Sequence, residues 1–310
     1  MWMIDRLANS RLETYTRLTI NPQYSVTLLA VQKLRVLLVF ITRSIFEWRV
    51  LRKAHHQTKK IKGAYSDKDA LVIAGGPSVN RLIVENVLQD QQSGQLDVFA
   101  VNYYAEGEIA SRLIPDYFGL SDPIHKPNSN VVFKGVNSQD IWAKLESWPQ
   151  TKLLLPHNWL NLKMYITNEV AVWFDDRDLP GWLRSNSPIR PRGYSSNTGL
   201  KAVACAMFMG YRNVFVIGLD NSLAKTIEVD SDNRLMEASS HFYDSESTIK
   251  EYRPHLYPRG VQDLLYDQSL SFVDLRKCFK SKNLFNIDTE SLTDALPKIA
   301  SCYVTELSLS

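Results

Sequence analysis

From residue 64 onward, short continuous apolar runs alternate with stretches of helical periodicity. The runs at residues 70–74, 96–101 and 116–120 have the length of single strands and lack the polar alternation of half-exposed ones. A turn at residues 75–78 follows the first run, and residues 79–89 then show apolar positions at helical spacing. Strand, turn and helix in this order predict an α/β fold with a mostly parallel sheet and helices on both faces.

The second half of the chain continues this alternation. We expect a helix at residues 200–210 that stops at Gly210, followed by a buried strand at residues 213–217. Residues 220–258 are polar with scattered aromatic side chains and show no clear period, which is typical of a lid or substrate loop. The other elements expected by the same criteria are a strand at 170–174, an amphipathic helix at 264–279, a short strand at 284–287 and a closing helix at 292–299.

Small or polar residues end the predicted strands. Asn102 ends the second strand, Asp122 lies just after the third, and Asp220 follows the strand at 213–217. In a parallel sheet the carboxyl ends of the strands meet at one edge, where backbone amides and helix N-termini converge on ligands. The sequence therefore predicts a shared crevice at this edge.

Residues 1–63 differ from the rest of the chain in charge. They hold twelve Lys or Arg against three acidic residues, a net charge of +9, whereas the remaining residues sum to −6. A helix-like stretch at about 24–62 is rich in bulky apolar residues, but basic residues from Lys33 to Arg49 interrupt it. Its longest apolar run is far shorter than the roughly 20 residues that a bilayer span needs.

Two interpretations of this basic arm remain open. Its helices pack on the body or on a second subunit, as in a homo-oligomer, or residues 1–63 make peripheral contact with an anionic membrane. Nucleic acid is not an expected partner, because the basic residues are interleaved with bulky aliphatic ones and no recognisable binding module follows. The first residues do not resemble a signal peptide. We expect a cytoplasmic protein, which in the membrane interpretation lies on the inner face of the cell membrane.

The composition is that of a compact domain, with 45% hydrophobic and 22% charged residues. The three cysteines are far apart in the sequence, with no Cys-x-x-Cys spacing to suggest a metal site or a redox pair. The turn at residues 75–78 is neither a dinucleotide fingerprint nor a P-loop. Composition alone therefore assigns no chemistry.

Several motifs at the predicted strand ends occur in a fixed order along the chain. They are residues 73–78, 99–102, 121–123, 197–199 before a helix that ends near Tyr211, 216–220, and Ser-His-Phe-Tyr at 240–243. In this order they resemble the bacterial CMP-sialic-acid sialyltransferases of glycosyltransferase family forty-two, and a related group that includes an archaeal pterin pyrophosphokinase. The resemblance runs from about residue 70 to residue 300 and leaves out the basic arm.

This resemblance implies a Rossmann-like, variant GT-A-like fold with a site for a nucleotide-sugar donor. Gly75 stands where the family has an asparagine, and Asp122 replaces another asparagine, so an anion takes the place of an amide. The residues that the resemblance places at the donor are Gly75, Gly76, Pro77, Ser78, Asn102, Asp122, Asn197, Thr198, Gly199, Asp220, Ser222, Tyr243, Glu290 and Ser291.

The resemblance implies that His241 is the general base. A sugar hydroxyl is a poor nucleophile until its proton is accepted, and a histidine with a pKa near neutrality suits that task. The family has a tyrosine two residues after Asp220 that assists the departing phosphate, and this chain has Ser222 there. The candidates to replace that tyrosine are Tyr243, Tyr252, Arg253, His255 and Tyr257.

Two acidic clusters are expected to be surface turns. Asp230 and Asp232 have the Asp-x-Asp form by which many glycosyltransferases hold a metal-bound nucleotide, but they lie in a polar, acidic loop. Residues 175–178 hold three aspartates just after a predicted strand, where a solvated turn is common.

We therefore expect a basic helical arm at residues 1–63 and a nucleotide-sugar-binding domain at residues 64–310. The expected enzyme is a glycosyltransferase that moves sialic acid or a related acidic sugar from a CMP-sugar to a glycan acceptor, in surface polysaccharide or lipopolysaccharide synthesis. The resemblance implies neither a metal nor a further cofactor. Two alternatives remain open: a Mg²⁺-dependent pyrophosphokinase that uses ATP and a pterin-like alcohol, and a non-catalytic polysaccharide-assembly protein.

Overall fold

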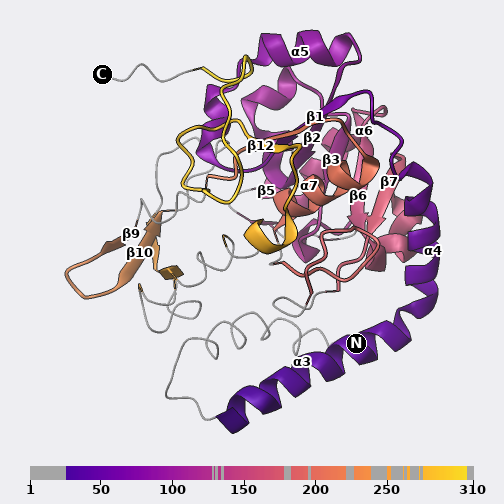
Figure 1. The fold of residues 1–310 in the computed structure, drawn as a ribbon, viewed down its shortest axis with the longest axis vertical. Coiled ribbons are helices and arrows are strands. Elements are labelled where there is room, and N and C mark those ends of the chain that lie inside the picture. The colour runs from indigo at the N-terminus through magenta and orange to yellow at the C-terminus, as the bar shows by residue number, and fades with distance from the viewer. Residues whose placement is uncertain are drawn as a thin grey trace.

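The core of the protein is a parallel sheet with helices on both faces (Figure 1). The structure, a computed structural model, describes residues 26–305 apart from 128, 130–131, 134–135, 178–182, 195–196, 221–226, 239–249, 253–260, 262–263, 266–271 and 273–274. Within these residues seven strands pair in the order β12-β8-β1-β2-β3-β6-β7, every pair parallel. The strands are β1 (Asp69–Ile73), β2 (Leu96–Val101), β3 (Tyr117–Gly119), β6 (Lys152–Pro156), β7 (Val170–Phe174), β8 (Val214–Ile217) and β12 (Leu284–Asn286). The predicted Rossmann-like fold is confirmed.

The strand order reverses beside β1. The chain moves outward from β1 through β2, β3 and β6 to β7, and then returns to place β8 on the other side of β1. At such a reversal the connections leave the sheet in opposite directions, which opens a crevice beyond the carboxyl ends of the two strands. The space beyond β1 and β8 is therefore the expected ligand site.

Alternate residues of β1 pack into two separate cores. Leu71 and Ile73 face α5 (Val84–Gln92) and α6 (Ser138–Glu146), whereas Ala70 and Val72 face α7 (Thr198–Met209). Because both faces of the sheet are covered, its strands are continuous apolar runs instead of alternating ones. This explains why the apolar runs predicted β1, β2, β3, β7, β8 and β12 nearly to the residue.

The helix expected at residues 79–89 is wrong in its bounds. A 3-10 helix, η2 (Pro77–Arg81), is followed by extended backbone and then by α5. The extended residues pair with the end of the described chain, where Leu82 bridges Val304 and the Ile83 amide donates to Tyr303 O at 2.8 Å. This long-range pairing interrupts the helical period.

The closing helix expected at residues 292–299 is also wrong. Residues 297–299 lie along β12, where the Asn286 amide donates to Pro297 O at 2.8 Å and the Ile299 amide donates to Asn286 O at 3.1 Å. Pro297 cannot donate a helical hydrogen bond, which favours the extended form. In the helix expected at 264–279, residues 264–265, 272 and 275–278 are helical among those described.

The segment expected to be an irregular loop contains an antiparallel sheet. Its strands are β9 (Ile227–Val229), β10 (Leu235–Ala238) and β11 (Lys250–Tyr252). Asp230 forms the turn between the first two, where its side chain accepts hydrogen bonds from the Asp232 and Arg234 amides. The Asp-x-Asp sequence is thus a hairpin turn, as expected. Short pieces complete the fold: β4 (Val132–Phe133), β5 (Val136–Asn137), η3 (Asn102–Glu106), η4 (Glu108–Ser111), η5 (Pro123–His125) and η6 (His157–Tyr165).

The described part of the basic arm consists of α3 (Val26–Phe46), α4 (Trp48–Thr58) and η1 (Lys59–Ile61). Helix α4 runs along the edge strand β7 and buries Leu51, Ala54 and Thr58 against the body (Figure 1). The Thr58 hydroxyl donates to Trp173 O at 3.2 Å and accepts from the Trp173 amide at 3.0 Å. No helix in the described ranges is both long enough and apolar enough to cross a bilayer.

The aspartates after β7 are not a solvated turn. Asp175 is 1% exposed and receives two hydrogen bonds from the Arg177 guanidinium, and Lys201 Nζ donates to Asp176 at 2.9 Å. The surface turn expected here is wrong, because α4 and the end of α3 cover this corner of the sheet. Glu47 extends the network through a contact of 2.8 Å with His157 Nε2.

Candidate functional site

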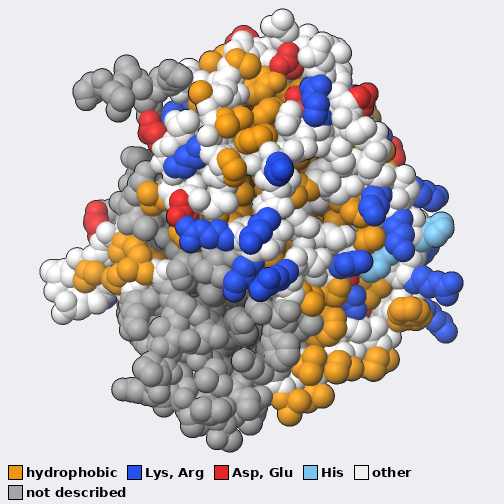
Figure 2. All heavy atoms as spheres, in the orientation of Figure 1, with side chains coloured by type: hydrophobic (Ala, Val, Ile, Leu, Met, Phe, Trp, Pro, Cys, Tyr) orange, Lys and Arg blue, Asp and Glu red, His pale blue; other side chains and the backbone are white. Residues whose placement is uncertain are grey.

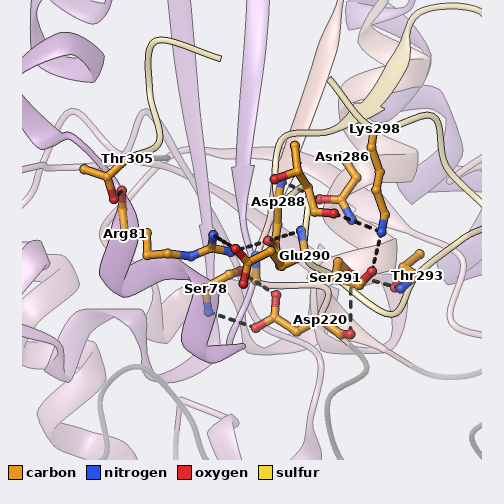
Figure 3. Close-up of polar contacts among 12 residues, drawn as sticks. Ser78, Arg81, Asp220, Asn286, Asp288, Glu290, Ser291, Thr293, Lys298 and Thr305 are labelled. Carbon is orange, nitrogen blue, oxygen red and sulfur yellow. Dashed lines mark hydrogen bonds and ion pairs between the residues drawn. The ribbon is translucent and has the colours of Figure 1, made fainter. Parts of the chain in front are cut away.

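Hydrogen bonds between two loops hold the ends of β1 and β8 together. The Ser78 amide donates to Asp220 Oδ2 at 2.9 Å, and the Ser78 hydroxyl donates to Asp220 Oδ1 at 2.5 Å (Figure 3). The same hydroxyl accepts from the Gly218 amide at 3.0 Å, and the Gly76 amide donates to Gly218 O at 2.9 Å. The turn at residues 75–78 and Asp220 therefore form one preorganised unit at the switch point of the sheet.

Glycine is required at two positions of this unit. A Cβ at Gly76 would lie 2.3 Å from Asp220 Oδ2 and 2.7 Å from Gly218 O. Gly218 has a φ of +80°, and its Cβ would lie 2.8 Å from the Ala74 backbone. Gly75 joins the strand to this close approach, and Pro77 starts η2 with its fixed φ.

The loop after β12 contacts the backbone at Asp220. The Ser291 hydroxyl donates to Leu219 O at 3.1 Å and to Asp220 O at 3.3 Å. The Arg81 guanidinium contacts Asp288 and lies 3.8 Å from Glu290 Oε1 (Figure 3). The sequence thus placed Ser78, Asp220 and Ser291 in one site, and the structure brings them into contact.

Asp220 is buried beside a second carboxyl group, that of Asp288. Burial raises its pKa, hydrogen bonds from Ser78 lower it, and the nearby Asp288 carboxyl raises it further, so that the net shift is upward. Asp288 in turn contacts Arg81. The charge of Asp288 is therefore balanced by Arg81, and the Asp220 carboxyl is held by Ser78.

The N-terminus of α7 lies beside this unit. Asn197 caps the helix by accepting from the Leu200 amide at 3.2 Å, and the Thr198 hydroxyl is 2.7 Å from the Ser121 hydroxyl. A Cβ on Gly199 would lie 3.0 Å from the Ala74 Cβ, so the helix start touches the tip of β1. Unpaired amides at a helix N-terminus favour anions, and this N-terminus lies at the carboxyl end of β1, where the sheet topology predicts the crevice.

Asn102 is the clearest candidate for a residue whose side chain binds a ligand. It has a φ of 52°, a conformation that costs most residues free energy, and its side-chain Oδ1 is buried with no hydrogen-bond partner. Buried polar atoms are nearly always hydrogen-bonded, so such an atom marks a place for a ligand or water. It lies directly after β2, the strand next to β1.

Asp122 has a local structural role. Its carboxylate accepts from the Ile124 amide at 3.1 Å and starts η5, while the side chain stays exposed. Asp122 therefore serves to start a short 3-10 helix.

Sequence reasoning missed the neighbouring pair Tyr103 and His125. His125 is 2% exposed, its ring lies 4.9 Å from the Tyr103 ring, and its Nδ1 has no hydrogen-bond partner. Burial lowers the pKa of His125, which the nearby Asp122 partly offsets, and burial together with Asp122 raises the pKa of Tyr103 to about 12. A lone histidine after the third strand gave no motif by which to find it.

Some predicted site residues lie outside the described residues. These are His241, Ser222 and Tyr243, together with Arg253, His255 and Tyr257; of Tyr252 the structure describes only the backbone, in β11. Among the described residues no group of three or more His, Cys, Asp or Glu side chains is placed to hold a metal ion.

Comparison with solved structures finds the MAf glycosyltransferase from Magnetospirillum magneticum AMB-1. It superposes with a TM-score of 0.42 at 11% sequence identity, over 89% of this chain and 42% of that one. This chain therefore spans less than half the length of that protein. No family model matches the chain, and no curated protein matches it significantly. At this level of identity and superposition, the likeness assigns no activity to the chain.

Proposed function

We propose that this protein is a glycosyltransferase that moves sialic acid or a related acidic sugar from a CMP-sugar to a glycan acceptor. The observation that supports it most is the buried, unpartnered Asn102 amide oxygen in a strained backbone at the switch-point crevice. That crevice also contains the N-terminus of α7. A donor with both an anionic phosphate and polar sugar and base groups matches this combination.

In this proposal the donor phosphate lies at the start of α7. The backbone amides at Thr198 and Gly199 face the phosphate oxygens, and Asn102 accepts a hydrogen bond from a hydroxyl or amino group of the donor. Asp220 holds the turn at residues 75–78 in shape.

The chemical step is a single displacement at the anomeric carbon. The acceptor oxygen forms a bond to that carbon, the bond to the phosphate oxygen breaks, and CMP leaves with the bonding electrons. His241 accepts the proton of the acceptor hydroxyl, as the family resemblance implies.

One observation favours a second candidate function. The buried Asp220 and Asp288 carboxyl groups are close enough to perturb each other, and two such groups are part of what a Mg²⁺ ion needs. This pair favours the ATP- and Mg²⁺-dependent pyrophosphokinase over the non-catalytic alternative. Asp288, one of the two carboxyl groups, also contacts Arg81.

Thermal unfolding with CMP, CDP, UDP or ATP, each with and without Mg²⁺, separates these functions. A ligand present at about a hundred times its Kd stabilises by about 2.7 kcal/mol. We expect CMP to raise the Tm without metal, and Asn102→Ala to abolish that rise. Stabilisation by ATP only with Mg²⁺ would favour the pyrophosphokinase, and no response to any nucleotide would favour the non-catalytic protein.

A further inference from the structure

The outer side of α3 carries a row of exposed apolar side chains. Leu34, Leu38, Ile41 and Ile45 follow one another at steps of four and three residues, which places them on one side of α3, and Trp48 begins α4 just after them. Their exposed fractions run from 43% to 68%, and the adjacent Phe46 is 78% exposed. Large apolar groups gathered in this way mark an interaction surface.

Exposed cations follow the apolar row on the next two elements, α4 and η1. At Glu47 the chain turns from α3 into α4, so the two helices do not share one axis (Figure 1), and Arg52 lies one turn after Trp48 on α4. Figure 2 shows basic side chains over α4 and hydrophobic side chains along α3 beside them. The exposed cations from the start of α4 to the residue after η1 are Arg49, Arg52, Lys53, Lys59, Lys60 and Lys62.

No acidic residue balances these cations locally. Glu47 is the one acid between residues 34 and 66, and it is engaged by Arg43 and His157. A surface with an apolar row and unbalanced positive charge matches the boundary of an anionic bilayer, where acyl chains and phosphates lie within a few ångströms of each other.

We propose that α3 and α4 dock this protein on an anionic membrane surface, with the apolar row of α3 in the acyl boundary and the α4 cations on lipid phosphates. A second copy of this chain fits less well, because pairing through this side would bring two sets of like charges together. The apolar row also spans only about two heptads, shorter than the three to four that indicate a coiled coil.

The docked arm would bring the candidate site near the membrane. The end of α3 contacts residues that follow β6 and β7, through Glu47 with His157 and through Ser44 with Arg177 at 2.6 Å. It therefore lies at the carboxyl edge of the sheet, about 20 Å from β1 across four strand spacings. If the proposed function holds, this arrangement suits an acceptor carried at a membrane surface; docking itself does not depend on that function.

Vesicle flotation with the full chain tests the proposal. Wild type should bind vesicles of phosphatidylcholine with phosphatidylglycerol and not those of phosphatidylcholine alone, and binding should weaken between about 0.05 and 0.5 M NaCl as charges are screened. The triple change Arg49→Glu, Arg52→Glu and Lys53→Glu should reduce the affinity about a hundredfold or more, since each lost cation removes about a fivefold factor. Lys277→Glu, Lys280→Glu and Lys282→Glu change the net charge equally at another exposed site and should have a much smaller effect.

A second variant tests the contribution of the apolar row separately from that of the cations. Ile45→Ser with Phe46→Ser should lower vesicle affinity at least about tenfold at every salt concentration, whereas Val229→Ser with Leu265→Ser, two exposed apolar residues elsewhere, should not. All these residues are exposed, so unchanged Tm and circular dichroism would show that the variants fold. Vesicle binding and unfolding are measured without nucleotide, so failure of the proposed function leaves this test intact.

Three outcomes would overturn the proposal. The first is that the wild-type protein binds neither kind of vesicle. The second is that the two triple charge-reversal variants lose binding equally, which would show general charge attraction. The third is a dimer in analytical ultracentrifugation that Ile45→Ser with Phe46→Ser dissociates while vesicle binding is absent, which would assign the row to a second copy.

Discussion

Two asparagines adopt the left-handed backbone conformation for different reasons. Asn102 has a φ of 52° at the end of β2, and Asn233 has a φ of 58° in the hairpin turn between β9 and β10. A hairpin turn commonly uses this conformation. At Asn102 it instead occurs at the end of a central strand, where the buried side-chain Oδ1 has no partner among the described residues.

Substitutions at the two asparagines should separate backbone strain from ligand binding. Asn102→Ala and Asn233→Ala should each destabilise by about 1–2 kcal/mol, because alanine in this conformation brings its Cβ against a carbonyl oxygen. The corresponding glycine variants should unfold within about 0.5 kcal/mol of wild type. Both Asn102 variants should lose stabilisation by CMP, and both Asn233 variants should keep it. Equal CMP responses at the two positions in thermal unfolding would remove Asn102 from the proposed site.

Substitution of the predicted base, His241, and of the predicted donor contact, Thr198, should change different properties of the enzyme. His241→Ala should lower kcat by roughly 10²–10⁴ with CMP affinity unchanged, because a general base faces the acceptor. Thr198→Val should mainly weaken donor binding, by about 1–3 kcal/mol if the donor oxygen is left unsatisfied.

Ser121→Ala is the control for Thr198. It removes the partner of the Thr198 hydroxyl, 2.7 Å away, and leaves the hydroxyl itself in place. Steady-state kinetics and calorimetry with CMP distinguish the roles. Full turnover in His241→Ala would transfer the role of base to another group, of which the buried His125 is one described candidate.

At the scale of elements, α4 protects the open edge of the sheet. Strand β7 is the last in the order, and the Thr58 hydroxyl bonds to both backbone polar groups of Trp173. An uncovered edge offers its N–H and C=O groups to other chains. The arm thus completes the sheet as well as carrying charge.

Thr58→Val should destabilise by about 1–3 kcal/mol, because it buries the Trp173 amide and carbonyl without partners. Thr58→Ser should restore most of this stability. Thr42→Val is the matched control: its hydroxyl donates to Leu38 O on exposed helix, so its loss should cost under about 0.5 kcal/mol. Urea unfolding gives the three values. Equal losses for Thr58→Val and Thr42→Val would mean that the edge contacts contribute nothing specific.

The elements predicted correctly from sequence are those whose pattern is local. Strands buried on both faces are apolar runs, and α7 has its cap at Asn197 and its stop at Gly210, with a φ of +88°. The splitting of residues 79–89 and the extended form of 297–299 depend on partners more than a hundred positions away or on another strand, which a local period does not contain.

The candidate site also has a part that the local sequence predicts and a part that it does not. Strand ends and a helix start predicted where Ser78, Asn102, Thr198 and Asp220 would gather. Nothing local to the sequence indicated that Asp220 would bond to Ser78, or that Asp175 would be buried under α4.

At the scale of the whole molecule, three acids, Glu47, Asp175 and Asp176, lie where the arm meets the body. Burial alone raises the pKa of Asp175, Asp176 and Glu47, but hydrogen bonds and charges of their basic partners outweigh it, so that each pKa is lowered. Those partners are chiefly Arg177, Lys201, and His157 with Arg43. A lowered pKa in the folded protein means that the unfolded chain binds more protons in acid.

We therefore expect the free energy of unfolding to fall as the pH drops below the ordinary values of these acids, 3.8 for Asp and 4.5 for Glu. The raised pKa of Asp220 acts in the opposite direction and offsets part of the loss. Asp175→Asn should be less stable than wild type by about 3–5 kcal/mol at pH 7, because it leaves Arg177 unpaired. The difference should shrink towards pH 3, as measured by urea unfolding at several pH values. A difference that stays constant with pH would show that Asp175 does not titrate with folding.

The reversal of strand order beside β1 also determines when, during synthesis on the ribosome, the sheet can be completed. Until β8 leaves the ribosome, β1, an inner strand of the finished sheet, is an open edge, and Asp220, which holds the turn after β1, is 142 positions beyond Ser78. Long-range pairing of this kind is slow, and an apolar open edge can pair with other nascent chains meanwhile. A ribosome that stalls between β7 and β8 would therefore release a chain with most of its sheet, no crevice, and a strong tendency to aggregate.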